Sequence, residues 1–153
     1  MIIFILIAVL LIVVDQLVKG WIVANIALGT SMPIIKNVFS LTYFQNTGAA
    51  WSMLEGQMSF FALVTTVAVG ACSYLLYKNR NGAKLYSLGL SLVLAGALGN
   101  FIDRMRLGYV VDMFQTDFVS FPIFNVADSC LVVGVILIFI YILFEERFKG
   151  AKA

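Results

Sequence analysis

Four long apolar stretches separated by polar connectors dominate this chain. They cover residues 2–26, 58–77, 85–102 and 125–144. Each is close to the roughly 20 residues that an α-helix needs to cross a bilayer. In lipid such stretches must be helical, because every backbone polar group has to be satisfied internally. The pattern therefore predicts an all-α membrane protein with four transmembrane helices, forming a single domain over residues 1–153.

The two longest connectors cover residues 27–57 and 105–124. Within the first, residues 38–44 are rich in β-forming side chains, and Asn46-Thr47-Gly48 is a turn signal. We therefore expect a small β-hairpin or cradle between the first and second helices. The second connector is long enough to fold back over the helix ends.

Basic residues indicate how the helices are oriented. Six of the ten lysines and arginines are expected at one end of the bundle, namely Lys78, Arg80, Lys84, Arg147, Lys149 and Lys152. The positive-inside rule makes this end cytoplasmic, which places both termini inside and the two long connectors outside the cell. The first apolar stretch lacks a basic start and exceeds an ordinary signal-peptide core, so we expect it to be a retained span.

Composition excludes several kinds of chemistry. With 62% hydrophobic and 12% charged residues, the chain is typical of an integral membrane protein, and a net charge of +2 gives no reason to expect a nucleic-acid partner. The absence of histidine excludes Ser-His-Asp catalysis and histidine-held haem or zinc. Cys72 and Cys130 lie inside apolar stretches, where buried structural thiols are expected.

Two acids, Asp112 and Asp128, flank the region in which this apolar chain collects polar residues. Ionisable groups in or beside membrane spans are candidates for a functional site. If the second connector folds back, Asp112 comes to lie opposite Asp128 at the start of the fourth helix. Two acids in a low-dielectric cleft share one proton, which is how aspartic proteases activate water, and such a pair requires no metal or organic cofactor.

Further polar residues group at the same helix ends, because residues three and four apart share a helix face. The end of the third span presents Asn100, Asp103 and Arg104, and the start of the fourth presents Asn125, Asp128 and Ser129. Structural interpretations stay open for each. Asp103 and Arg104 form an ion pair at a helix end, or Arg104 holds a substrate carbonyl. The structural interpretation of Asn125 is an N-cap, and that of Asp128 is an acid that complements the helix dipole.

Other polar and small residues have mainly structural interpretations. Asp15 and Lys19 are spaced i,i+4, so we expect them to pair and to fix the first helix against the others. Asn46 and Gly48 form a turn or a polar wall for a bound peptide. The small residues Ala95, Gly96, Ala97 and Gly99 favour close helix packing. Ser52 and Ser129 lack a nearby base, which argues against a nucleophilic serine.

Five short motifs resemble those of the bacterial lipoprotein signal peptidases, also called signal peptidase II, and occur in that family's order. They are Asp15-Gln16-Leu17-Val18-Lys19, Asn46-Thr47-Gly48-Ala49-Ala50-Trp51-Ser52, Gly99-Asn100 with Asp103-Arg104, Val110-Val111-Asp112, and Phe124-Asn125-Val126-Ala127-Asp128-Ser129. Departures from the common pattern are Val18, Trp51 and Met113. Trp51 and Met113 are expected to alter the shape of the pocket and the response to inhibitors.

The resemblance implies an intramembrane aspartic peptidase of the bacterial cytoplasmic membrane, with an extracytoplasmic β-cradle and an Asp112–Asp128 catalytic dyad. It implies that the site is shaped by Asn46, Gly48, Asn100, Asp103, Arg104 and Asn125, with structural support from Asp15 and Lys19. The implied substrate is a diacylglyceryl-modified prolipoprotein, cleaved just before its lipidated cysteine. We expect a monomer in contact with membrane lipid and no cofactor.

Two other classes of function compete with this interpretation. A small proton-coupled transporter also uses intramembrane acids, but it favours acids at mid-span and an inverted repeat, which we do not find. A metal-dependent lipid transferase needs several carboxylates around Mg²⁺, and the alternation of Asn and Asp here supplies few.

Overall fold

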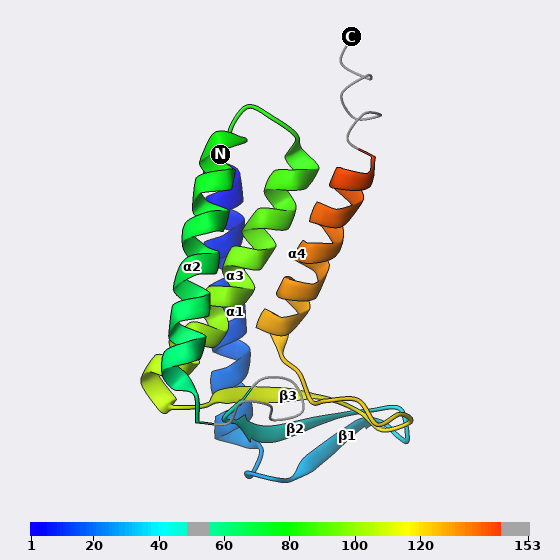
Figure 1. Ribbon diagram of the computed structural model, residues 1–153. Helices are drawn as coiled ribbons and strands as arrows, with labels where there is room; N and C mark the ends of the chain where they lie inside the picture. The colour runs from blue at the N-terminus through cyan, green and yellow to red at the C-terminus, as the bar shows by residue number, and fades with distance from the viewer. Residues whose placement is uncertain (49–55, 145–153) are drawn as a thin grey trace.

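The computed structural model describes residues 1–48 and 56–144. Within this part of the chain, four helices form a bundle and three strands form a sheet at one end of it (Figure 1). In chain order the elements are α1 (Ile2–Asn25), β1 (Ser31–Ile35), β2 (Phe39–Asn46), α2 (Met58–Lys78), α3 (Lys84–Leu107), β3 (Val110–Thr116) and α4 (Val126–Leu143).

All four helices are long and apolar enough to cross a membrane, which confirms the four predicted spans. Helix α3 is the centre of the bundle. Half of the residues in its most apolar stretch are buried, whereas only 17%, 6% and 17% are buried in the corresponding stretches of α1, α2 and α4. The outer helices therefore present apolar side chains to their surroundings, as expected of a bundle whose solvent is lipid.

The third span is longer than predicted. It was expected to end at residue 102, but α3 continues to Leu107 and ends at Gly108, whose φ of 80° is left-handed. Glycine adopts this conformation without a steric penalty and commonly terminates helices. Arg104 and Arg106 lie in the last turn, where cations complement the helix dipole. Charged residues that suggested a connector thus belong to the helix.

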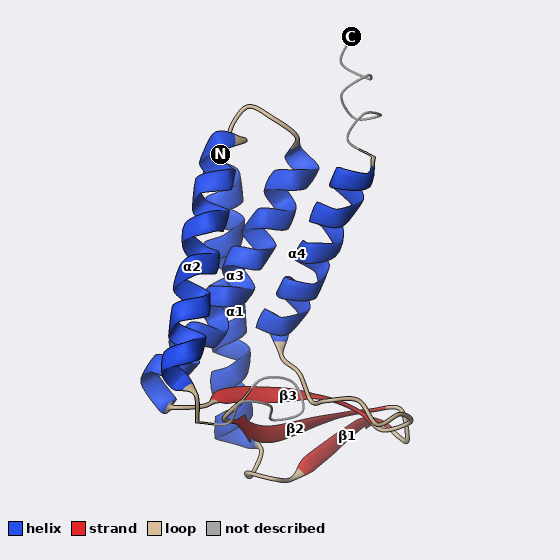
Figure 2. Ribbon diagram, in the orientation of Figure 1, coloured by secondary structure: helices blue, strands red, loops and turns tan. Residues whose placement is uncertain are grey.

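The predicted hairpin between α1 and α2 is present as β1 and β2, but the sheet has a third strand that was not predicted (Figure 2). Strand β3 comes from the connector between α3 and α4 and pairs antiparallel with β2. The register places Phe44 opposite Asp112 and Asn46 opposite Val110. Asp112 is therefore held by a strand ladder, not by a free loop.

Close packing of α3 against α4 depends on glycine. A Cβ at Gly96 would collide with the carbonyl oxygen of Ala127, and a Cβ at Gly89 would lie 2.9 Å from the carbonyl oxygen of Gly134. Only hydrogen in place of a side chain lets the backbones approach this closely. The prediction that small residues allow close helix contact is confirmed at Gly96 and Gly99.

Two apolar clusters hold the fold together. One lies inside the bundle and includes Leu90 of α3 and the buried free thiol of Cys72 from α2. The other joins α1 to the sheet, with Ile22 and Met113 completely buried. Met113, noted as a departure from the common family pattern, therefore packs in the core beneath the sheet. The position of β3 relative to α1 follows from this contact.

Candidate active site

A pocket of about 700 Å³ lies where the bundle meets the sheet. Its walls come from α2, α3, α4, strands β2 and β3, and the loop of residues 121–124. Most of the lining is apolar, including Val64, Ala68, Leu131 and Val132. Its polar lining residues are Asn46, Thr65, Asn100, Arg104, Asp112, Asp128 and Ser129. The two acids predicted from the sequence therefore line the same, mostly apolar cavity.

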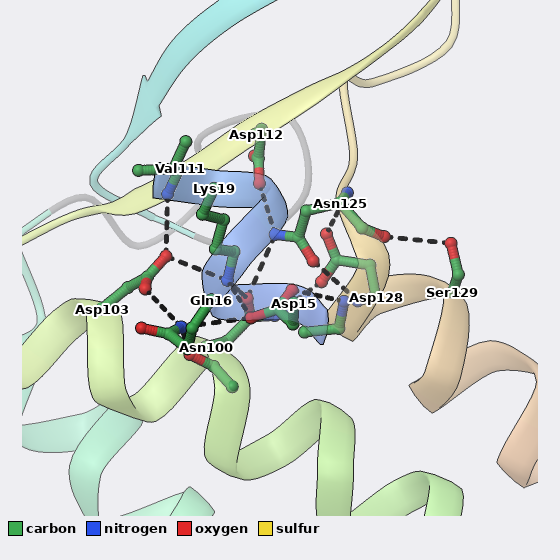
Figure 3. Close-up of polar contacts among 12 residues, drawn as sticks. Asp15, Gln16, Lys19, Asn100, Asp103, Val111, Asp112, Asn125, Asp128 and Ser129 are labelled. Carbon is green, nitrogen blue, oxygen red and sulfur yellow. Dashed lines mark hydrogen bonds and ion pairs between the residues drawn. The ribbon is translucent and has the colours of Figure 1, made fainter. Parts of the chain in front are cut away.

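Asn125 joins the two acids (Figure 3). Its side-chain Nδ2 donates to Oδ1 of Asp112 at 2.6 Å, and its backbone N–H donates to Oδ2 of Asp128 at 3.1 Å. Its Oδ1 accepts from the backbone N–H of Asp128 at 2.8 Å, which completes a capping box at the start of α4. The N-cap interpretation of Asn125 is confirmed, and the same residue contacts both carboxylates.

The other oxygens of the two acids are also paired. Asn46 donates to Oδ2 of Asp112 at 2.9 Å, and Asn100 donates to Oδ1 of Asp128 at 2.7 Å. Asp112 is 1% exposed, so these amides replace water as its partners. Neither carboxylate is paired with a cation among residues 1–48 and 56–144, because both ion pairs there belong to Lys19.

The contacts of Lys19 fix the orientation of the Asn100 amide. Lys19 Nζ, which can only donate, lies 3.0 Å from Oδ1 of Asn100, so the NH₂ group of Asn100 must face Asp128. The same Oδ1 accepts from Nδ2 of Asn125 at 3.1 Å. A cation on α1 thus determines which atoms of two asparagines point at the acids.

Lys19 is itself buried and fully paired. Its ammonium lies 2.9 Å from Asp15 and 2.9 Å from Asp103. These two ion pairs and the hydrogen bond to Asn100 together use its three N–H groups. The predicted Asp15–Lys19 pair is confirmed. Asp15 also accepts the backbone N–H of Ala127 in the first turn of α4, at 2.9 Å. The pair therefore anchors α1 to both α3 and α4.

Asp103 does not form the ion pair with Arg104 that was one of the two predicted alternatives. Its oxygens accept from Gln16 at 2.9 Å and from the backbone N–H of Val111 at 3.1 Å, in addition to Lys19. The expected ion pair between Asp103 and the adjacent Arg104 is wrong for the described structure, because the two side chains leave α3 in different directions. Asp103 ties α3 to α1 and to β3 instead.

Arg104 faces the pocket. Its Nη2 donates to the carbonyl oxygen of Gly48 at 2.9 Å, and its guanidinium carbon lies 4.4 Å from the centre of the Phe61 ring. The predicted turn at Asn46 is confirmed, because Oδ1 of Asn46 accepts from the backbone N–H of Gly48 at 2.9 Å. Gly48 is thereby held where its carbonyl meets Arg104.

Burial raises the pKa of Asp112 from its ordinary value of 3.8 to about 7, and the nearby charge of Asp128 adds to this shift. Hydrogen bonds from Asn46 and Asn125 and the charge of Lys19 oppose it. Desolvation disfavours the charged form of an acid, and a like charge does the same. Asp112 on β3 therefore exchanges its proton near neutral pH, far above the range of an ordinary aspartate.

Comparison with known proteins decides the family. Residues 7–144 match the family described as signal peptidase (SPase) II. The chain belongs to the signal peptidase II family. Among the relatives of this signal peptidase II chain, the lipoprotein signal peptidase of Latilactobacillus sakei is 57% identical over 96% of this chain and 97% of the relative. That of Enterococcus faecalis is 57% identical over 99% of this chain and 93% of the relative.

Solved structures agree with this assignment to signal peptidase II. A bacterial membrane enzyme determined by the in meso method at 2.3 Å superposes with a TM-score of 0.89 at 41% identity, covering 94% of this chain and 88% of that one. A second, at 1.9 Å, gives 0.84 at 42% identity, covering 92% of each chain. The chain is a multi-pass membrane peptidase, and the transporter and lipid-transferase hypotheses are set aside.

Sequence reasoning identified most of the polar residues that line this pocket but missed two contacts near it. Gln16, which donates to Asp103 and to the carbonyl oxygen of Gly99, was read only as part of a motif. Phe61 was read as one more apolar residue of a span. Its place near the start of the apolar stretch 58–77, at the same expected end of the bundle as Asn46 and Arg104, was the signal that could have indicated a role at the site.

Several predictions fall on other parts of the chain. Trp51, Ser52 and the basic residues Arg147, Lys149 and Lys152 lie outside the described residues. Ser129 lines the pocket, and its hydroxyl donates to the carbonyl oxygen of Asn125 at 3.0 Å. Within residues 1–48 and 56–144, no three His, Cys, Asp or Glu side chains are grouped as a metal site would require.

Proposed function

We propose that this chain is an aspartic endopeptidase that removes signal peptides from diacylglyceryl-modified prolipoproteins, with Asp112 and Asp128 as its catalytic pair. The observation that carries the proposal is the double contact of Asn125, which links one carboxylate from β3 and one from α4 across the same pocket. The names of the relatives, which are lipoprotein signal peptidases, support the substrate class.

The two acids divide the chemistry of peptide hydrolysis. Asp112, with a pKa of about 7, is the acid that carries the shared proton, and Asp128 is the base. Asp128 takes a proton from water as its oxygen attacks the peptide carbonyl, while Asp112 donates its proton to the carbonyl oxygen. The proton on Asp128 then passes to the departing amine as the C–N bond breaks, and Asp112 takes back a proton from a hydroxyl of the tetrahedral intermediate as the carbonyl re-forms. No metal ion takes part in these steps.

The pocket supports a lipid-modified substrate. Apolar side chains of α2 and α4, among them Val64 and Val132, suit the acyl chains, and the two acids lie level with the end of the bundle where the lipidated cysteine would sit. Burial of each methylene in such a wall contributes about 0.8 kcal/mol. Cleavage just before the lipidated cysteine follows, because the acyl chains fix the height of the peptide relative to the acids.

The polar amides and Arg104 hold the peptide backbone in this proposal. Asn46 and Asn100 keep the acids oriented, and Arg104, on the same wall, is placed to contact a substrate carbonyl. The basic connector between α2 and α3 lies at the opposite end of the bundle from the sheet (Figure 1). The positive-inside rule then assigns the site to the extracytoplasmic face of the bacterial cytoplasmic membrane.

A cleavage assay tests the dyad. Asp112→Asn and Asp128→Asn should each reduce cleavage of a diacylglyceryl-modified prolipoprotein by purified protein in detergent by about 100- to 10,000-fold, because each removes an acid or base from the reaction. An unlipidated substrate should be cleaved far more slowly by the wild type, and a chelator should have no effect.

The matched control is Asp117→Asn. Asp117 lies outside the pocket lining and bonds to Ser40 and Gln115 of the sheet, so this change should leave the rate unaltered. Folding of every variant is checked by thermal unfolding in the same detergent. Full activity in either dyad variant, or activity lost to the chelator, contradicts the mechanism.

A further inference from the structure

The guanidinium of Arg104 is held by two elements that are not part of its own helix. The Gly48 carbonyl, just after β2, accepts from Nη2, and the Phe61 ring in the first turn of α2 lies under the guanidinium carbon. A cation over an aromatic ring contributes more when the contact is removed from water. Phe61 and Gly48 therefore fix the plane and the position of the guanidinium.

Arg104 does not form an ion pair with the nearby carboxylates, which would be stronger partners than a carbonyl and an aromatic ring. Arg104 lines the same pocket as Asp112 and Asp128, yet the ion pairs among residues 1–48 and 56–144 are both formed by Lys19. The Nε of Arg104 is buried and has no hydrogen-bond partner in this part of the structure. A buried donor without a partner is costly, so its position needs an outside constraint. The stack on Phe61 is such a constraint.

An ion pair between Arg104 and the dyad would change the chemistry of the pair. A guanidinium beside two carboxylates favours the state in which both are ionised, and the proton needed for general-acid catalysis is then lost. Within the described residues, the two acids instead accept hydrogen bonds from neutral groups, namely the side-chain amides of Asn46, Asn100 and Asn125 and the Asn125 backbone. Because Arg104 forms no ion pair with either acid within the described residues, the state with one shared proton is preserved.

The charged groups around the dyad single out Arg104 as the one that can reposition. Within the described residues these groups are Asp15 and Lys19 from α1, Asp103 and Arg104 from α3, Asp112 from β3 and Asp128 from α4. Lys19 is locked by three partners. Strand β2 has no charged residue, and α2 carries its one charge, Lys78, at the far end.

We propose that Phe61 is a positioning residue of this peptidase: its ring, with the Gly48 carbonyl, holds the Arg104 guanidinium on the pocket wall and keeps it from pairing with Asp112 or Asp128. The inference rests on the proposed function and extends it to a residue of α2 that touches neither acid. Without the ring, the guanidinium is free to turn toward the carboxylates.

The test replaces the ring and follows the pH dependence of cleavage. Phe61→Leu should lower kcat/KM about tenfold at pH 7 and move the alkaline limb of the pH profile about one unit toward lower pH, since an ion pair makes the dyad lose its proton earlier. Phe61→Trp, which retains the aromatic face, should restore both values. Phe61→Met repeats the test with a side chain that keeps most of the volume.

The matched control is Phe60→Leu. Phe60 is adjacent on α2, contacts the edge of Phe61 and does not stack on Arg104, so its loss should leave the pH profile unchanged. A Phe61→Leu enzyme with reduced activity and the wild-type pH profile has lost only structural support, and this result overturns the inference. So does a failure of Phe61→Trp to restore the profile.

A second measurement separates this inference from the proposed function. Infrared spectroscopy follows the band of the protonated carboxyl group, identified as the band that Asp112→Asn abolishes. The pH midpoint of this band can be measured without any cleavage. It should fall by about one unit in Phe61→Leu and stay constant in Phe60→Leu. An unshifted midpoint overturns the role of Phe61 even if the wild type cleaves the lipidated substrate, and absence of cleavage with a shifted midpoint overturns only the proposed function.

Discussion

At the scale of single residues, the site depends on how amides substitute for water around two acids. Asp112 accepts hydrogen bonds from the side chains of Asn46 and Asn125. Asp128 accepts them from the Asn100 side chain and the Asn125 backbone N–H. A neutral amide can donate to a carboxylate without neutralising its charge, so the pair stays free to exchange a proton. In the proposed mechanism, asparagine at these positions therefore serves the chemistry better than lysine or arginine would.

The raised pKa of Asp112 has a measurable effect on stability. The folded state binds this proton more tightly than the unfolded chain does, so the stabilisation is complete below pH 3.8 and is lost as pH rises to about 7. Relative to Asp112→Asn, the free energy of unfolding of the wild type should fall by up to about 1.4 kcal/mol per pH unit across this window. Above pH 7 the difference should be constant.

Reversible unfolding in mixed micelles between pH 4 and 8 measures this difference. Asp128→Asn, which removes the neighbouring charge, should move the end of the window to lower pH. A wild type whose stability relative to Asp112→Asn rises over the same range would show that Asp112 is ionised in the fold.

At the scale of elements, hydrophobic length was sufficient to find the four helices, and the β-forming run at 38–44 was sufficient to find β2. The sequence did not reveal β3, because its seven residues place an acid among apolar side chains and gain their identity as a strand only from pairing with β2. The end of α3 was missed for a related reason, since charges near Arg104 resembled the start of a connector. Contacts between distant segments, such as Gln16 with Asp103, leave no local pattern at all.

Packing of α3 on α4 should control activity through Asp128. Gly96→Ala places a methyl group against the Ala127 carbonyl and 2.6 Å from Leu131 Cγ, so the helices must move apart. Overpacking of this kind costs about 1–3 kcal/mol and should displace Asp128, which follows Ala127. We expect a lower thermal midpoint in detergent and a reduced cleavage rate.

Gly70→Ala is the control for this change. A Cβ at Gly70 has nothing within 4 Å, and alanine is the better helix former, so both midpoint and rate should match or exceed the wild type. Equal behaviour of the two variants would contradict the importance of the α3–α4 contact.

At the scale of the whole molecule, the sheet and the pocket lie at one end of the bundle and the basic α2–α3 connection at the other (Figure 2). Labelling of single cysteines in intact cells tests the orientation this implies. Asn81→Cys should react with a membrane-impermeant reagent only after lysis, and Lys36→Cys, beyond β1, should react in intact cells. Cys72 and Cys130 are buried and give little background. The reverse labelling pattern would place the site on the cytoplasmic face.

The bond between the Asp15 carboxylate and the Ala127 backbone joins residues 112 positions apart. During synthesis the first of them leaves the ribosome long before the second, and Asp128 arrives later still. Nascent chains that carry only the first three spans therefore contain Lys19 and Asn100 but lack Asp128, the proposed base. Under the proposed mechanism, proteolytic activity is acquired only when the last span inserts, and a translation product truncated before that span cleaves no substrate.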